Sequence, residues 1–89
     1  MTASDDSPLT FPCRFPVKAM GRADGAFERT VWSIIVRHAP DISEDDVSIT
    51  ESRQGSYVSV TVTVTATSRA QLDAIYADLQ AHDAVLAAL

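Results

Sequence analysis

Few residues of this sequence have the types and the spacing that catalysis or metal binding requires. The two histidines, His38 and His82, could serve as general bases or metal ligands. Each is expected at the C-terminal end of a helix, where an imidazole commonly satisfies free carbonyl groups and the negative end of the helix dipole. Neither has a second ligand at a useful spacing, so we interpret both as structural.

An acidic run, Asp41, Glu44, Asp45 and Asp46, could hold a hard cation. It lacks the D-x-D-x-D-G order and the turning glycine of a calcium loop, so a solvated loop is the better interpretation. We therefore predict no metal site.

Cys13 is the only cysteine, which excludes an internal disulfide and fits a reducing compartment. It shares strand parity with Phe15 and Val17, and this favours a small buried apolar group over a nucleophile. No base is placed to activate any serine or threonine. The sequence thus predicts no catalytic residue, no cofactor and no enzymatic activity.

The turn between the first strand and the first helix could bind an anion. It reads Met-Gly-Arg-Ala-Asp-Gly and leads into a helix N-terminus, whose free amides favour a carboxylate. It resembles the glycine-containing loop in which ACT-type regulatory domains bind amino acids, although the proline usual there is absent. A plain helix entry would also explain it. The residues of this candidate ligand site are Lys18, Met20, Gly21, Arg22, Asp24 and Gly25.

Length and charge limit the classes of function. A chain of 89 residues has room for one domain, and its formal net charge of −5 disfavours contact with nucleic acid or anionic lipid. From the residues at the N-terminus we expect no signal peptide, and no apolar run is long enough to span a membrane. We expect a cytoplasmic protein with a mobile tail over residues 1–9 and a single domain over residues 10–89.

The stretch from Gly55 to Thr67 predicts the central strand of the fold, because valines alternate with hydroxyl side chains at a period of two. The predicted core positions are Val58, Val60, Val62 and Val64. The opposite row predicts an accessible partner surface, formed by Tyr57, Ser59, Thr61 and Thr63.

The remaining elements follow from apolar periodicity and from capping signals. We predict strands over residues 13–20, ended by Gly21, over 46–53 and over 85–89. Asp24 is the expected N-cap of a helix that Pro40 terminates, and Ser68 with Gln71 predicts the capping box of a second helix ending near His82.

This order predicts an α+β, ferredoxin-like βαββαβ sandwich, in which two helices cover one face of a four-stranded antiparallel sheet. RNA-recognition motifs share this topology and stack bases on aromatic side chains of their central strands. Here the exposed row of the central strand offers Tyr57 alone. We therefore expect no nucleic-acid partner.

A series of short motifs resembles the YbeD-like family of small bacterial proteins. They are Phe11-Pro12, Phe15, Lys18 with Met20-Gly21, Arg37-His38-Ala39-Pro40, the run Ser52-x-x-Gly55-x-Tyr57-x-Ser59-Val60, and Ala66-Thr67. The entry to the first helix departs from this pattern. The resemblance implies a ferredoxin-like fold similar to ACT regulatory domains, without an established activity, and suggests a link to lipoate metabolism.

Two hypotheses for function remain open. The first is a non-enzymatic regulatory or protein-interaction module that acts through the uncovered face or an edge strand of its sheet, with a weak homodimer among its partners. The alternative is an ACT-like sensor that binds an amino acid or carboxylate at the first strand–helix loop.

Overall fold

The computed structural model describes residues 9–89, so residues 1–8 of the predicted tail lie outside the described part of the chain. Leu9, which the sequence placed in that tail, is half-buried against the core. The elements follow in the order β2 (Cys13–Arg22), α1 (Phe27–Val36), the 3-10 helix η1 (Glu44–Asp46), β3 (Val47–Glu51), β4 (Tyr57–Ala66), α2 (Arg69–Ala81) and β5 (Ala87–Ala88).

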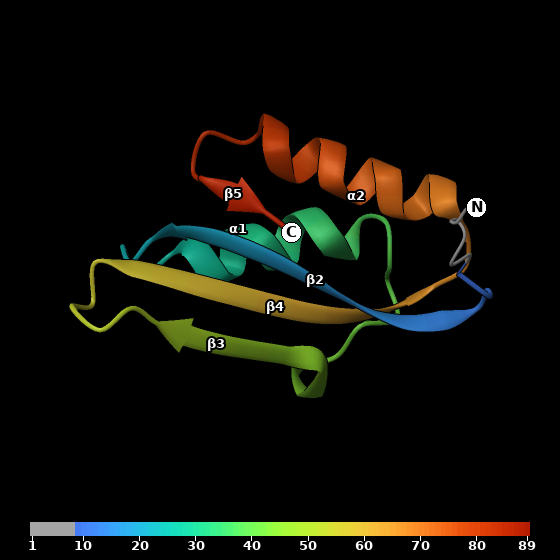
Figure 1. Ribbon diagram of the computed structural model, residues 1–89, viewed down its shortest axis with the longest axis horizontal. Coiled ribbons are helices and arrows are strands. Elements are labelled where there is room, and N and C mark those ends of the chain that lie inside the picture. The colour runs from blue at the N-terminus through green and yellow to red at the C-terminus, as the bar shows by residue number, and fades with distance from the viewer. Residues whose placement is uncertain (1–8) are drawn as a thin grey trace, which may run out of the picture.

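The four strands form one antiparallel sheet in the order β3-β4-β2-β5. The hairpin joins the neighbouring strands β3 and β4, whereas each helix connects two strands that have one other strand between them. Two interleaved strand–helix–strand units produce this order. Both helices lie on the same side of the sheet (Figure 1). The predicted α+β ferredoxin-like fold is confirmed.

Strand β4 is central because its valines form the floor of the core. Val60, Val62 and Val64 are buried, and β2 places Val17 opposite Val62. Val58 was predicted to be equally buried but is only half-buried. It pairs with Gly21, which has no side chain, and with Glu51 of the edge strand, so less apolar material surrounds it.

The helices cover this floor with apolar stripes at helical spacing. Both stripes consist of buried side chains: Phe27, Val31, Ile34 and Ile35 from α1, and Leu72, Ile75 and Leu79 from α2. The two stripes and the valines of β4 belong to one hydrophobic cluster, as the sequence predicted.

Strand β2 continues through Gly21 to Arg22, so the prediction that Gly21 ends the strand was wrong. Gly21 instead allows close packing. A Cβ atom added there would lie 2.7 Å from the backbone oxygen of Ala84 and 2.7 Å from Cδ1 of Phe27. The glycine therefore lets the ring of Phe27 and the chain before β5 approach the sheet.

The start of α1 also differs from the prediction, because Asp24 is not its N-cap. The cap is Ala26, and Oδ1 of Asp24 accepts a hydrogen bond from the Ala26 amide at 2.9 Å. Gly25 lies between them with φ +85°, a conformation that favours glycine. The aspartate therefore stabilises the turn before the helix rather than the first turn of the helix.

Both edge strands are shorter than predicted. β3 covers Val47–Glu51, since Asp46 belongs to η1 and Ser52 begins the hairpin turn. β5 is reduced to Ala87–Ala88, although Leu86 and Leu89 also form backbone hydrogen bonds to β2.

The cap of α2 is confirmed, because the Ser68 hydroxyl accepts from the Gln71 amide at 3.1 Å. The reciprocal half of the predicted capping box is displaced by one residue: the Gln71 side chain accepts from the backbone N–H of Thr67 at 2.7 Å.

We expect Val62→Ala to lower the free energy of unfolding by about 1–3 kcal/mol, because it removes buried methyl groups from the floor of the core. Thr61→Val is the matched control, since it keeps a β-branched side chain on the opposite face and should change stability by less than about 0.5 kcal/mol. Urea unfolding of both variants measures the difference. Equal losses would contradict the assignment of the two faces.

Gly21→Ala should destabilise the protein by about 1–3 kcal/mol through overpacking against Phe27 and the backbone near Ala84. A double-mutant cycle with Phe27→Leu tests the cause, because a smaller side chain at residue 27 relieves part of the overlap. The two substitutions should then cost less together than the sum of their separate costs. Additive costs would show that the ring does not depend on the glycine.

Candidate functional site

Within residues 9–89, no helix covers the second face of the sheet, which we call the open face. Its side chains form rows that run across the strands. One row joins Ser48, Thr61, Lys18 and Leu89, and the next joins Thr50, Ser59, Met20 and Ala87. The register therefore gathers residues from all four strands on one flat surface.

The predicted partner surface lies on this open face. Tyr57 is 43% exposed and lies at one end of β4. Ser59, Thr61 and Thr63 are partly exposed and point to the same side. The structure thus brings the four predicted residues together.

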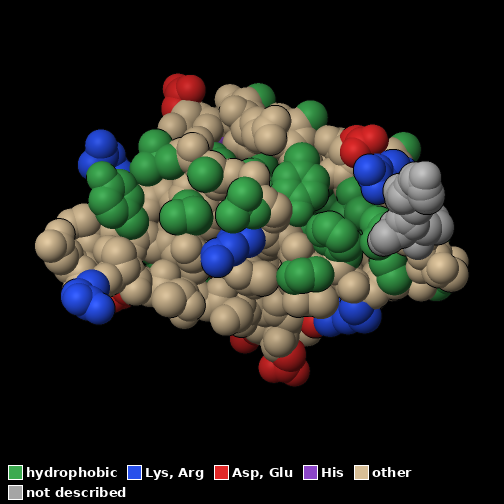
Figure 2. Space-filling view, viewed as in Figure 1, with side chains coloured by type: hydrophobic (Ala, Val, Ile, Leu, Met, Phe, Trp, Pro, Cys, Tyr) green, Lys and Arg blue, Asp and Glu red, His purple; other side chains and the backbone are tan. Residues whose placement is uncertain are grey.

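The open face is basic, although the whole chain is acidic. The four strands contain three cations, Arg14, Lys18 and Arg22, all on β2 and all with the same parity. Within residues 9–89, the only carboxylate in the strands is Glu51, which pairs with Val58 and therefore faces the helices. Figure 2 shows a basic group near the centre of this face with hydrophobic side chains around it, while acidic groups appear towards the margins.

Arg22 and Tyr57 are register partners and interact directly. The guanidinium carbon lies 5.8 Å from the centre of the tyrosine ring. Such an exposed cation–π contact contributes about 0.5–1 kcal/mol. It also holds a cation and an aromatic ring side by side, which is a pairing common in protein interfaces.

Arg14, at the other end of β2, forms an ion pair with Asp46. The backbone N–H of Ser43 and the Arg14 guanidinium both donate to the carboxylate, and they lower the pKa of Asp46 below its ordinary value of 3.8. The cation is therefore neutralised locally. Lys18 and Arg22 form no ion pair within the described residues.

The six residues of the candidate ligand site are not brought together. Lys18, Met20 and Arg22 lie on the open face, whereas the space above Gly21 on the opposite face is filled by Phe27. Asp24 is held by the turn, and Gly25 lies at the mouth of a groove on the helical side.

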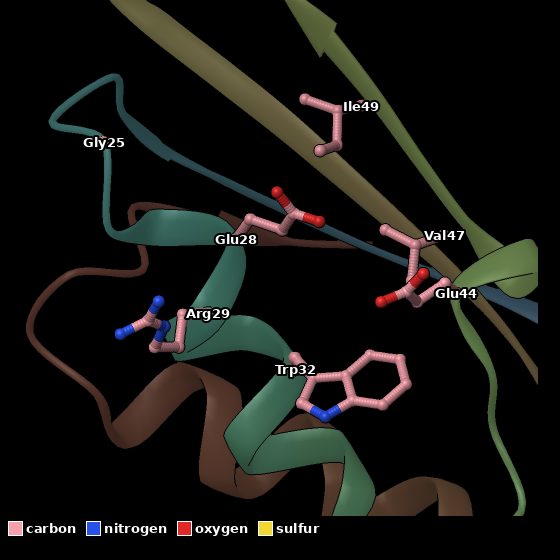
Figure 3. Close-up of a pocket in the computed structure, with 7 residues that line it drawn as sticks. All are labelled: Gly25, Glu28, Arg29, Trp32, Glu44, Val47 and Ile49. Carbon is pink, nitrogen blue, oxygen red and sulfur yellow. The ribbon is translucent and has the colours of Figure 1, made fainter.

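That groove, between α1 and β3, was not predicted from the sequence. It has a volume of about 740 Å³ and is open to solvent along one side; its lining residues are Gly25, Glu28, Arg29, Trp32, Glu44, Val47 and Ile49. Figure 3 shows Trp32 extending from α1 towards Val47 and Glu44. Ile49 is 46% exposed although it points towards the helical side. Ile49 is the only residue that could have indicated the groove from the sequence. Its exposure could be predicted only if β3 were already known to be an edge strand.

The histidines and Cys13 have structural surroundings. Nε2 of His38 lies 2.6 Å from Oδ2 of Asp78, and this contact links the end of α1 to α2. The sequence had instead predicted that the imidazole pairs with free carbonyl groups at the helix end. Nδ1 of His82 accepts from the backbone N–H of Ala84. Cys13 is half-buried against the core. No group of three potential metal ligands occurs in residues 9–89.

The fold defines a small α+β domain with a ferredoxin-like sheet, and sequence comparisons identify its family. The profile of the family described as "Protein of unknown function (DUF493)" matches residues 6–89. The chain belongs to this family. The match agrees with the resemblance to YbeD-like proteins and establishes no function, because the family is itself of unknown function.

Bacterial relatives agree with this assignment. A UPF0250 protein of Chromobacterium violaceum is 51% identical over 75 residues, which cover 84% of each chain. A UPF0250 protein of Nitrosomonas europaea is 40% identical over 82 residues, which are 92% of this chain and 94% of the relative. A third, from Ectopseudomonas mendocina, is 45% identical over 91% of each chain. In the described part of the chain, neither helix is long and apolar enough to cross a bilayer.

The lowered pKa of Asp46 predicts a pH dependence of stability. Because its folded pKa lies below 3.8, the ionised carboxylate stabilises the native state above about pH 4, and this contribution is lost as the pH falls through the folded pKa. Asp46→Asn should therefore reduce stability at neutral pH and flatten the decline in stability below about pH 4. Asp45→Asn is the control, since this side chain forms no hydrogen bond or ion pair within residues 9–89. Urea midpoints between pH 2 and pH 7 measure both; an equal flattening in the control would contradict the assignment to Asp46.

Proposed function

We propose that this protein is a non-enzymatic interaction module that binds an acidic protein surface through its open face, in the cytoplasm. The observation that carries the proposal is the charge of that face. Among residues 9–89, the open side of the four strands has two unpaired cations, Lys18 and Arg22, and no strand carboxylate, in a chain with a net charge of −5; Arg14 is the third cation and is paired with Asp46. A basic surface in an acidic protein needs a physical reason. Complementarity to a negatively charged partner supplies one.

The apolar groups around the cations support a protein as the partner. Tyr57 and Met20 flank the unpaired cations Lys18 and Arg22, and Leu89 is 68% exposed beside Lys18. A mixture of aromatic, methionine and arginine side chains is typical of the centre of a protein interface. A binder of phosphate backbones would instead need several more unpaired cations.

The flatness of the surface favours a transient complex. Short hydroxyl side chains lie between the cations and apolar groups of this face; they belong to Ser48, Thr50, Ser59 and Thr61. A partner can therefore approach closely and exchange hydrogen bonds. An obligate interface would be more continuously apolar.

The test is a site-specific photocrosslink. A photoreactive phenylalanine at Thr61 should capture a protein partner in living cells, and Lys18→Glu with Arg22→Glu should reduce the yield at least tenfold, because two reversed charges oppose an acidic partner. The same photoreactive residue at Ala77, exposed on α2, is the positional control, and Arg69→Glu, an exposed reversal on the helical side, is the charge control.

Capture from Ala77 alone, or capture that ignores the reversal of Lys18 and Arg22, would overturn the open-face proposal. Thermal unfolding should show that the double reversal remains folded, since both side chains are exposed. An amino acid or carboxylate that raises the melting temperature of the unmodified protein would favour the sensor alternative instead.

A further inference from the structure

The groove between α1 and the edge strand β3 carries an inference that is independent of the open face. We propose that it binds an extended segment of another protein, in which an apolar residue is flanked by basic residues two positions away on each side. The segment adds a strand to the free edge of β3, and its groove-facing side chains lie between β3 and α1.

The edge of the sheet provides the backbone partners. β3 is the terminal strand of the order β3-β4-β2-β5, and within the described residues it pairs only with β4. Alternate amides and carbonyls of such a strand point away from the sheet and can pair with an added strand.

The floor of the groove provides the apolar contact. Ile49 stands at the middle of β3 and is 46% exposed, and Trp32 of α1 and Val47 of β3 are only partly buried beside it. A further strand beside β3 would cover these three side chains. An apolar residue of the added segment, placed opposite Ile49, would cover them.

The charges around this floor select basic flanking residues. Glu44 lies in η1, just before β3, Glu51 lies at the end of β3, and Glu28 projects from α1 between the helix and Ile49. Among the described residues that line the groove, Arg29 is the one cation, and its side chain points away from β3 in Figure 3. Residues i and i+2 of a strand are about 7 Å apart on the same face, so basic residues two positions from the central one reach the carboxylates at each end.

A second copy of this chain fits the groove poorly. Antiparallel pairing of two β3 strands would place Glu28, Glu44 and Glu51 of both copies at one interface, with only Arg29 of each copy among the groove-lining residues described to offset them. Like charges brought together in this way oppose association. The same carboxylates favour a basic segment of a different protein.

The experiment uses the whole chain and a synthetic peptide, acetyl-Thr-Lys-Thr-Val-Thr-Lys-Thr-amide. Trp32 is the only tryptophan, so its fluorescence reports the groove directly and should shift to shorter wavelength on binding. In an isotope-labelled sample the amide signals of Val47–Glu51 should move. The register control is acetyl-Lys-Thr-Thr-Val-Thr-Thr-Lys-amide, which has the same composition but places both lysines on the face opposite the valine; it should bind at least tenfold more weakly.

Two variants of the protein separate the groove from the rest of the strand. Ile49→Lys should reduce binding of the first peptide at least tenfold, whereas Ser48→Lys, on the adjacent residue but on the open face, should retain binding within about threefold. Peptide binding that leaves Trp32 and β3 unchanged, equal binding of the two peptides, or no binding at millimolar peptide would overturn the proposal. So would a concentration-dependent dimer that buries Ile49. Reversal of Lys18 and Arg22 should not affect the peptide, which distinguishes this result from that for the open face.

Discussion

The pairing of β2 with β4 is the constraint on which the rest of this structure depends. The two strands are joined in register from Cys13 opposite Ala66 to Arg22 opposite Tyr57. Because side chains alternate, a slip of β2 by one residue against β4 would turn Lys18 towards the helices and expose Val17. The same parity therefore fixes two properties at once: an apolar floor for the core and a face on which every cation of the strands is gathered.

Sequence reasoning was most successful where local signals and tertiary packing agree. The alternation of β4, the apolar stripes of both helices and the cap at Ser68 each have one physical interpretation, and together they imply the strand order. It failed where a residue has two local interpretations. Gly21 resembles a strand terminator, but its role is to admit the ring of Phe27, a contact between elements that the local sequence does not contain. Asp24 has a side chain suited to an N-cap, but the turn with positive φ at Gly25 puts the helix N-cap two residues later, at Ala26.

The candidate surfaces show the same division. The row Tyr57, Ser59, Thr61 and Thr63 could be predicted because one strand contains all four residues. The groove could not, because α1, η1 and β3 each contribute side chains to it. Ile49 follows the same alternation as Val60, its register partner, yet Val60 is buried and Ile49 is 46% exposed. Only the strand order distinguishes them: among residues 9–89, β4 has a neighbouring strand on each side and β3 has one neighbour.

The net charge of −5 describes neither surface. Charges on a protein surface are screened over about 8 Å at physiological ionic strength, whereas the shortest dimension of this molecule is 23 Å. A partner approaching the open face therefore responds mainly to Lys18 and Arg22, and one approaching the groove responds mainly to Glu28, Glu44 and Glu51. Because the two surfaces have opposite signs, the two proposed partners would have opposite charge, and each surface would disfavour the partner of the other. Under the two proposals, one small domain would in this way hold two different proteins in a defined relative orientation.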